Sequence, residues 1–402
     1  MDTTSDTEHP TGDTDHQPPR IRRSERIREN LAGSILWQSL HRTQAGNPPS
    51  QIFQNPTSPA PKANKRTKRH PIHEQNRPIN PQLNSPLFNG RIPPEIRDEI
   101  FQYALTEYTK TDPSSQYAVS TNYTRPGYTG QRTVSTTLLQ TCRLAYLETY
   151  HLPPTTKEHV FWHARWPPNL DRDKWGDHVH EARYFRDFQP WQMKLVKEIH
   201  FFTQLFWLEH SFPLFCSQGY LQGMEKVTIT IRRGDWWWNE RNAALEINPQ
   251  RGHSSEAGVM KADWEAERRG QVIPWNENGW GCAFSKLKSL RELVIEFETS
   301  EDKKEELMAI VEKAATWRFP LNEGAVLSTE GAKAYVRTWE APKIYWSDEC
   351  PYCTRAIACG KLGPPTEGCE KRRKLMAEDK GPLCYIASLR WKKIDGEVRS
   401  TA

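Results

Sequence analysis

The cysteines near the carboxyl end are the residues whose spacing most clearly suggests chemistry. Five of the eight cysteines fall within 35 residues, namely Cys350, Cys353, Cys359, Cys369 and Cys384. A Cys-x2-Cys pair lets two thiolates hold one zinc ion from a tight turn, and two further thiolates complete a tetrahedron. Cys350, Cys353, Cys359 and Cys369 form the most compact set, with Cys384 as a substitute. Because the other gaps differ from the usual doubled pattern, two alternatives stay open: structural zinc and free reduced thiols.

The first two of these cysteines also carry a resemblance. Cys350-Pro351-Tyr352-Cys353 resembles the active-site motif of glutaredoxins, in which the first cysteine is a thiolate nucleophile at a helix N-terminus. The resemblance implies thiol transfer. However, only 49 residues follow Cys353, whereas the glutaredoxin fold places this motif near the start of a complete domain. We therefore do not expect redox catalysis here, and structural zinc and free reduced thiols remain the two alternatives.

Other catalytic motifs are missing from the sequence. Gly279-Trp280-Gly281 lacks the third glycine and the preceding strand of a phosphate-binding loop, and no Gly-x-Ser-x-Gly elbow occurs. His178 and His180 form a neighbouring pair without a third metal ligand. We therefore expect a non-enzymatic protein, with no cofactor unless the cysteines hold a structural zinc ion.

The positive charge of the chain is concentrated in its amino-terminal part. Residues 1–85 contain 12 Lys and Arg against 8 Asp and Glu, whereas the remaining residues contain 43 against 42. The same segment holds 11 of the 30 prolines. A segment of this composition buries too little apolar surface to offset its ordering entropy, so we predict that residues 1–85 form a disordered tail.

One basic cluster of this tail has the composition of a localisation signal. It has no acidic residue and is flanked by prolines, and its cations are Lys62, Lys65, Arg66, Lys68 and Arg69. Such a stretch is typical of a nuclear-localisation segment that binds an import receptor. It equally suits contacts with the phosphates of a nucleic acid, and a solvated charge run is the third alternative.

The compartment follows from what the sequence lacks. The chain opens with acidic residues rather than the basic and then apolar pattern of a signal peptide. No apolar run approaches the ~20 residues of a membrane helix. Eight cysteines in 402 residues are too dilute for a disulfide scaffold. We expect an intracellular protein of the nucleus or cytoplasm, with no membrane contact.

Hydrophobic periodicity predicts a helical module over residues 86–155. Ile92, Ile96, Ile100 and Tyr103 recur at helical spacing and predict a helix over 97–105 with one apolar face. A second helix is predicted over 134–150, because residues 138, 142, 145 and 149 would lie on one side of it. The prolines at 153 and 154 are expected to stop it. The polar residues 106–133 between the two helices are expected to form a long loop.

An α/β domain is predicted over residues 156–402, including the Cys-rich segment 350–384. Strand-like runs alternate with helical ones, which favours an α/β layer of irregular strand-helix units. The expected strands are 195–202, 226–231, 290–297, 334–339 and 383–391, with a helix over 305–317. The fold class is thus mixed, α+β or α/β. Because strand side chains alternate between faces, at least one of the three tryptophans at 236–238 should be exposed.

The helical module resembles a known family. Ile92-Pro93-Pro94-Glu95-Ile96-x3-Ile100 resembles the opening of the F-box, and the segment from Leu138 to Tyr146 resembles its later part around Cys-Arg and an aromatic residue. Both together are similar to a group of uncharacterised fungal F-box-like proteins. The resemblance implies that the helices dock on Skp1 through Ile92, Pro93, Pro94, Ile96 and Ile100. It also implies that the carboxyl-terminal domain recruits a protein substrate for ubiquitin transfer.

Two functions therefore stay open from the sequence. The first is a substrate adaptor of a ubiquitin ligase. The second is a nuclear or nucleic-acid-associated binding protein that uses its basic tail, with the F-box-like helices purely structural. In the second case the face of Ile92, Ile96 and Ile100 simply packs against the second helix.

Overall fold

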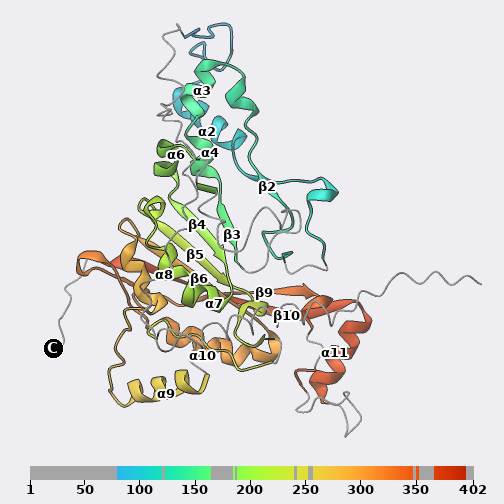
Figure 1. The fold of residues 1–402 in the computed structure, drawn as a ribbon. Helices are drawn as coiled ribbons and strands as arrows, with labels where there is room; N and C mark the ends of the chain where they lie inside the picture. Colours follow the sequence, from blue (N-terminus) through green and yellow to red (C-terminus); the bar gives the residue numbers. More distant parts are fainter. Residues whose placement is uncertain are drawn as a thin grey trace, which may run out of the picture. The chain divides into compact units, whose positions relative to one another are not determined.

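A mixed sheet of eight strands organises the chain (Figure 1). The computed structural model describes residues 79–119, 123–163, 184–185, 188–239, 242–251, 257–346, 350–352 and 366–394. The strands of the large sheet are β3 (His159–Trp162), β4 (Glu198–Phe202), β5 (Lys226–Ile231), β6 (Glu292–Ser300), β7 (Phe319–Pro320), β8 (Val326–Ser328), β9 (Tyr335–Pro342) and β10 (Lys380–Ile394). A separate pair comprises β1 (Tyr108–Thr109) and β2 (Arg132–Thr133).

Short helices connect these strands. The α-helices are α2 (Pro94–Ala104), α3 (Arg143–Thr149), α4 (Leu152–Thr156), α6 (Pro190–Leu195), α7 (Leu205–His210), α8 (Phe212–Phe215), α9 (Ala257–Arg268), α10 (Lys304–Ala314) and α11 (Glu367–Ala377). The 3-10 turns are η1 (Pro113–Ser115), η2 (Thr137–Gln140), η4 (Gly219–Leu221), η5 (Arg233–Asp235), η7 (Trp280–Lys286), η8 (Glu301–Lys303), η9 (Asn322–Gly324) and η10 (Lys343–Tyr345).

The order of the strands combines parallel and antiparallel pairing. β3, β4, β5 and β6 are parallel neighbours in chain order, so each connection between them returns over the sheet. β10 then lies antiparallel to β6. On its other side β10 pairs first with β9 and then with β8, which β7 extends.

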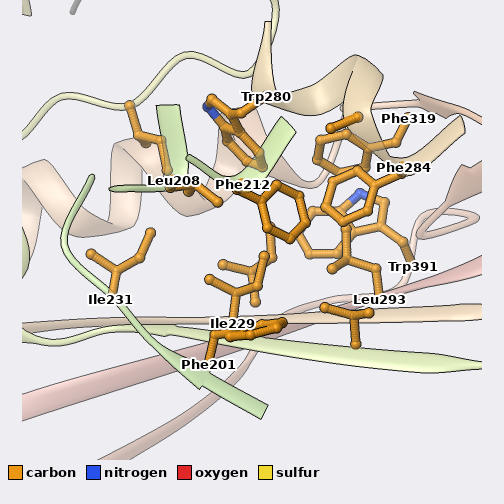
Figure 2. Close-up of a cluster of buried hydrophobic side chains, with 14 of the residues drawn as sticks. Phe201, Leu208, Phe212, Ile229, Ile231, Trp280, Phe284, Leu293, Phe319 and Trp391 are labelled. Carbon is orange, nitrogen blue, oxygen red and sulfur yellow. The ribbon is translucent and has the colours of Figure 1, made fainter. Parts of the chain in front are cut away.

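One face of the sheet is apolar and carries the main core (Figure 2). A row of buried side chains in register crosses five strands through Phe161, Phe201, Ile229, Ile295 and Leu389. Helices α7, α8 and α10 and the turn η7 cover this row with their own apolar side chains. Figure 2 shows Phe212, Phe284 and Trp280 above the strands.

The opposite face changes character across the sheet. The neighbouring row runs through Trp162, Phe202, Thr230, Glu296 and Ser388, because side chains one residue apart on a strand point to opposite faces. Arg125, from the segment between β1 and β2, lies 3.6 Å from Glu296 of this row.

Most of the predicted strands and the long helix are confirmed. β5 matches the predicted 226–231, and α10 matches the predicted helix over 305–317. The mixed fold class is confirmed as well. Trp236 is 4% exposed and Trp238 is 40% exposed, so at least one of the three tryptophans is exposed as predicted. The strand argument does not give the reason, because the three residues follow η5 outside the strands and Trp238 has a φ of 52°.

The predicted second helix over 134–150 is wrong. The segment forms η2, then α3, and Cys142 between them is extended at φ −156° and ψ 163°. The Cys142 side chain accepts a hydrogen bond from the Ala145 backbone N–H, so it caps a new helix instead of continuing the old one. The prolines at 153 and 154 do not stop a helix either, since they occupy the first turn of α4.

The predicted long loop over 106–133 is also wrong in part. Its two ends form the antiparallel pair β1–β2, with Tyr108 opposite Thr133. Further backbone bonds tighten the segment, because the Gln131 N–H donates to the Ser115 oxygen at 2.8 Å. Of the predicted tail, residues 1–78 lie outside the described residues, whereas residues 79–85 already contain a turn in which the Ser85 N–H donates to Gln82.

A glycine of β10 tests this architecture. Gly381 lies at the register shift between Lys380 and Leu383, and a Cβ atom added there would overlap the backbone oxygens of Ala341 and Pro342. We predict that Gly381→Ala lowers the free energy of unfolding by about 1–3 kcal/mol, because β9 must move away. Urea unfolding followed by tryptophan fluorescence measures this change.

The control is Gly223→Ala, where no atom lies within 4 Å of the added Cβ. Its free energy of unfolding should change by less than about 1 kcal/mol. Equal unfolding midpoints for the two variants would contradict the close approach of β9 and β10.

Candidate functional site

Helix α2 carries the residues that the F-box resemblance singles out. Pro93 is its N-cap residue and Pro94 occupies the first turn, where a missing N–H leaves no hydrogen bond unmade. Glu95 in the same turn faces the positive end of the helix dipole. The helix closes where the Leu105 N–H donates to the Phe101 oxygen at 3.0 Å.

One side of α2 is buried. Phe101 is 1% exposed and Leu105 is fully buried, and both pack with Leu152 in a small apolar cluster. The half-buried side chains around this cluster are Leu87, Phe88, Val134, Leu138 and Leu139. The cluster thus joins α2 to the segments on either side of it, at residues 87–88 and 134–152.

The other side of α2 is exposed and apolar. Ile96 is 48% exposed, Ile100 is 40% exposed and Tyr103 is 83% exposed. At about 100° per residue these three side chains fall within about 60° of arc, roughly opposite Phe101 and Leu105. We refer to Ile96, Ile100 and Tyr103 as the α2 stripe.

The alternative that Ile96 and Ile100 pack against the second helical segment is wrong. Phe101 and Leu105 make that contact instead, which leaves the α2 stripe uncovered. The remaining predicted contact residues flank the stripe: Ile92 is half-buried, and Pro93 and Pro94 are exposed.

A polar border runs along the α2 stripe. Glu95 and Glu99 are exposed, and at about 100° per residue they lie on the side of the stripe away from Phe101. Glu99, Gln102, Tyr103 and Thr106 line a shallow hollow at the carboxyl end of the helix. The exposed face is therefore apolar at its centre and acidic along one edge.

An ion pair fixes α2 against the later F-box-like segment. Arg97 of α2 binds Glu148 of α3 with two hydrogen bonds, of 2.7 and 3.0 Å. The same guanidinium donates to the Leu87 oxygen at 3.1 Å and stacks over the Phe88 ring. Bidentate pairs of this kind fix orientation as well as distance.

The predicted zinc ligands are partly brought together. The sulfur atoms of Cys350 and Cys369 lie 3.7 Å apart. Cys353 and Cys359 lie outside the described residues. Cys384 belongs to a different cluster, with Ala341 and Tyr345. Within the described ranges no group of three or more potential metal ligands occurs.

Sequence reasoning missed a buried polar network on the second face of the sheet. The Tyr128 hydroxyl donates to Glu158 Oε1 at 2.7 Å, and His200 Nδ1 lies 2.7 Å from the same oxygen. His200 Nε2 lies 2.8 Å from the Thr230 hydroxyl, which donates to Glu296 at 2.8 Å. The signal was available, because polar residues alternate with apolar ones along β5 and β6.

Arginines complete this network. Arg125 Nη2 lies 3.2 Å from Glu298 and 3.6 Å from Glu296, and its side chain is 1% exposed. Arg337 of β9 donates to the other oxygen of Glu296 at 2.8 Å. Although burial raises the pKa of Glu296, the charge of Arg125 and further partners hold it below its usual range.

Two groups of this network have strongly shifted pKa values. Burial alone would raise the pKa of Glu158, but hydrogen bonds and charge from His200, together with Tyr128 and Arg132, lower it to about 2. Burial and the Glu158 carboxylate raise the pKa of Tyr128 far above its usual range. A general acid or base works best with a pKa near the ambient pH, and these two groups are driven away from it.

Comparisons with models of protein families, with curated proteins and with solved structures give no match. The basic cluster at residues 62–69, and His178 with His180, lie outside the described residues. Over the ranges that the structure covers, each helix is too short or too polar to cross a bilayer.

Glu158 provides a pH prediction. Its pKa is lower in the folded chain than in the unfolded chain, so its stabilising contribution is present above about pH 4.5 and is lost as the pH falls toward 2. Because the side chain is 33% exposed, we expect this contribution to be only about 1–2 kcal/mol. Urea unfolding at about pH 6 and about pH 3 should show a smaller acid loss for Glu158→Gln than for the wild type.

The matched control is Glu198→Gln, since the Glu198 side chain is 64% exposed and pairs only with Lys226 at the surface. Its acid loss should equal that of the wild type. If Glu158→Gln loses as much stability in acid as the control, the network does not depend on the Glu158 charge.

Proposed function

We propose that this chain is an F-box-type substrate adaptor of a ubiquitin ligase, in which α2 docks on Skp1. The α/β part would then contact the protein that receives ubiquitin. The proposal begins from the resemblance of Ile92–Ile100 and Leu138–Tyr146 to the F-box. It is supported by the α2 stripe, which leaves apolar side chains of that same motif available to a partner.

The spacing of the α2 stripe suits a helix that lies in a groove. Ile96, Ile100 and Tyr103 follow the i, i+4, i+7 pattern by which helices anchor in apolar grooves. A helix that only supports the fold would bury its apolar residues on one side, whereas α2 is apolar on two. Exposed apolar side chains at these spacings are typical of a binding surface.

The acidic border adds a chemical requirement for the partner. Glu95 and Glu99 lie beside the stripe, while the Arg97–Glu148 ion pair holds the helix in place. A complementary partner groove is therefore apolar at its floor and carries cations on one rim. Such charges mainly set the association rate and the orientation of docking.

The test compares two double substitutions in the full chain. We predict that Ile96→Asp with Ile100→Asp weakens binding to purified Skp1 at least about tenfold, because buried anchor residues commonly contribute more than 1 kcal/mol each. The control is Leu214→Asp with Val272→Asp, since these side chains are 69% and 86% exposed and lie outside α2. Isothermal titration calorimetry measures the dissociation constants.

Folding must be matched before the affinities are compared. The circular dichroism spectra and urea midpoints of both variants should equal those of the wild type, because all four side chains are at least 40% exposed. Absence of Skp1 binding by the folded wild type would reject the adaptor function. Equal losses in both variants would place any binding outside the α2 stripe.

The alternative function, nucleic-acid binding through the basic tail, makes a different prediction. Phosphate contacts release counterions, so binding would weaken steeply with added salt and disappear on removal of residues 1–85. Skp1 binding through the α2 stripe should survive that removal. The two functions are thus separable in one set of titrations.

A further inference from the structure

The separation of two cysteine sulfurs points to a metal. Cys350 Sγ and Cys369 Sγ lie 3.7 Å apart, although 19 residues separate them in the chain. Two thiolates bound to one zinc ion at about 2.3 Å, with a tetrahedral angle between them, have sulfurs about 3.8 Å apart. A disulfide would require about 2.05 Å. The observed distance matches two thiolates on one tetrahedral ion, and it is also the contact distance of two thiols that share an S–H···S hydrogen bond. The metal content of the protein distinguishes these two states.

Helix α11 places the second sulfur where negative charge is favourable. Thr366 is the N-cap residue of α11, and its hydroxyl accepts the Cys369 backbone N–H at 3.3 Å. The hydroxyl oxygen also lies 3.1 Å from the Cys369 sulfur, to which it can donate. The positive end of the helix dipole favours a thiolate at this position in the first turn.

A close contact between Tyr352 and Gly368 fixes the positions of the two cysteines. A Cβ atom added at Gly368 would lie 2.5 Å from Cδ1 of Tyr352, so the aromatic ring packs directly on this glycine. Tyr352 follows Cys350 by two residues, and Gly368 directly precedes Cys369. The ring on the glycine thus fixes the chain around both sulfurs, and Cys369 is fully buried beneath it.

We propose that Cys350 and Cys369 are two thiolate ligands of one tetrahedral, structural zinc site that ties residues 350–352 to the start of α11. Each thiol gives up its proton to solvent as its sulfur binds the metal, which makes the affinity depend on pH. The proposal names these two ligands and no others, since Cys353 and Cys359 lie outside the described residues. The site is independent of Skp1 docking.

Metal content is the first measurement. The full chain, purified in reducing buffer without chelator, should contain about one zinc ion per molecule, as measured by inductively coupled plasma mass spectrometry. Cys350→Ser and Cys369→Ser should lower the zinc content at least about tenfold, since each removes a ligand. The control Cys282→Ser, at a half-buried cysteine of η7, should retain the metal.

A second measurement does not depend on removing a thiol. Cobalt(II) added to the metal-free chain should give the intense visible bands of a tetrahedral thiolate site. Gly368→Ala keeps every cysteine but displaces the Tyr352 ring, and we expect it to weaken cobalt binding at least about tenfold. Gly223→Ala, with open space around its Cβ, should bind cobalt as the wild type does.

Three outcomes would overturn the assignment. The first is a folded wild type that holds neither zinc nor cobalt. The second is a Cys350–Cys369 disulfide, detected by peptide mass spectrometry in the protein as purified from reducing buffer. The third is zinc that remains bound in both Cys350→Ser and Cys369→Ser, which would place the metal on other residues.

Discussion

The buried ion pairs of Arg125 with Glu296 and Glu298 are the interaction on which the second face of the sheet depends. Glu298 is fully buried, and a buried carboxylate without a partner costs several kcal/mol. Its cation comes from a segment far earlier in the chain, between β1 and β2. The same segment supplies Tyr128, whose ring packs on Phe202 and whose hydroxyl binds Glu158. Residues 123–133 thus supply a charged partner and an aromatic cover for this face.

This dependence changes how the helical segments relate to the sheet. Residues 105–142 separate α2 from α3 in the sequence, and part of this stretch packs on the sheet through Arg125 and Tyr128. The ion pair of Arg97 with Glu148 joins α2 to α3 across this stretch. Arg132 of β2 forms ion pairs with Glu158 and Glu107. The segment between β1 and β2 thus supplies a charged partner for the carboxylates of β6.

The parts that sequence patterns predict well are those in which one local rule decides the structure. β5 alternates polar and apolar residues along its length, and α10 has apolar residues at helical spacing on one face. The predicted helix over 134–150 is wrong because apolar spacing does not show that the backbone is extended at Cys142. That residue caps α3 by accepting a hydrogen bond from the Ala145 N–H. The polar network could not be assembled in advance, because His200, Thr230 and Glu296 meet through strand register and not through sequence proximity.

The same reasoning separates the two candidate binding features. Periodicity identified the α2 stripe correctly as one apolar face but could not tell whether that face is buried, since Phe101 and Leu105 offer a second apolar side on the same helix. Cysteine spacing named Cys350 and Cys369 together with Cys353, whereas only the fold shows that a ring on Gly368 holds the first two at a metal-binding separation. In both cases residue type is readable from the chain, while exposure and distance are properties of the packing around it. The exposure of the α2 stripe is thus decided by which side of the helix the core covers.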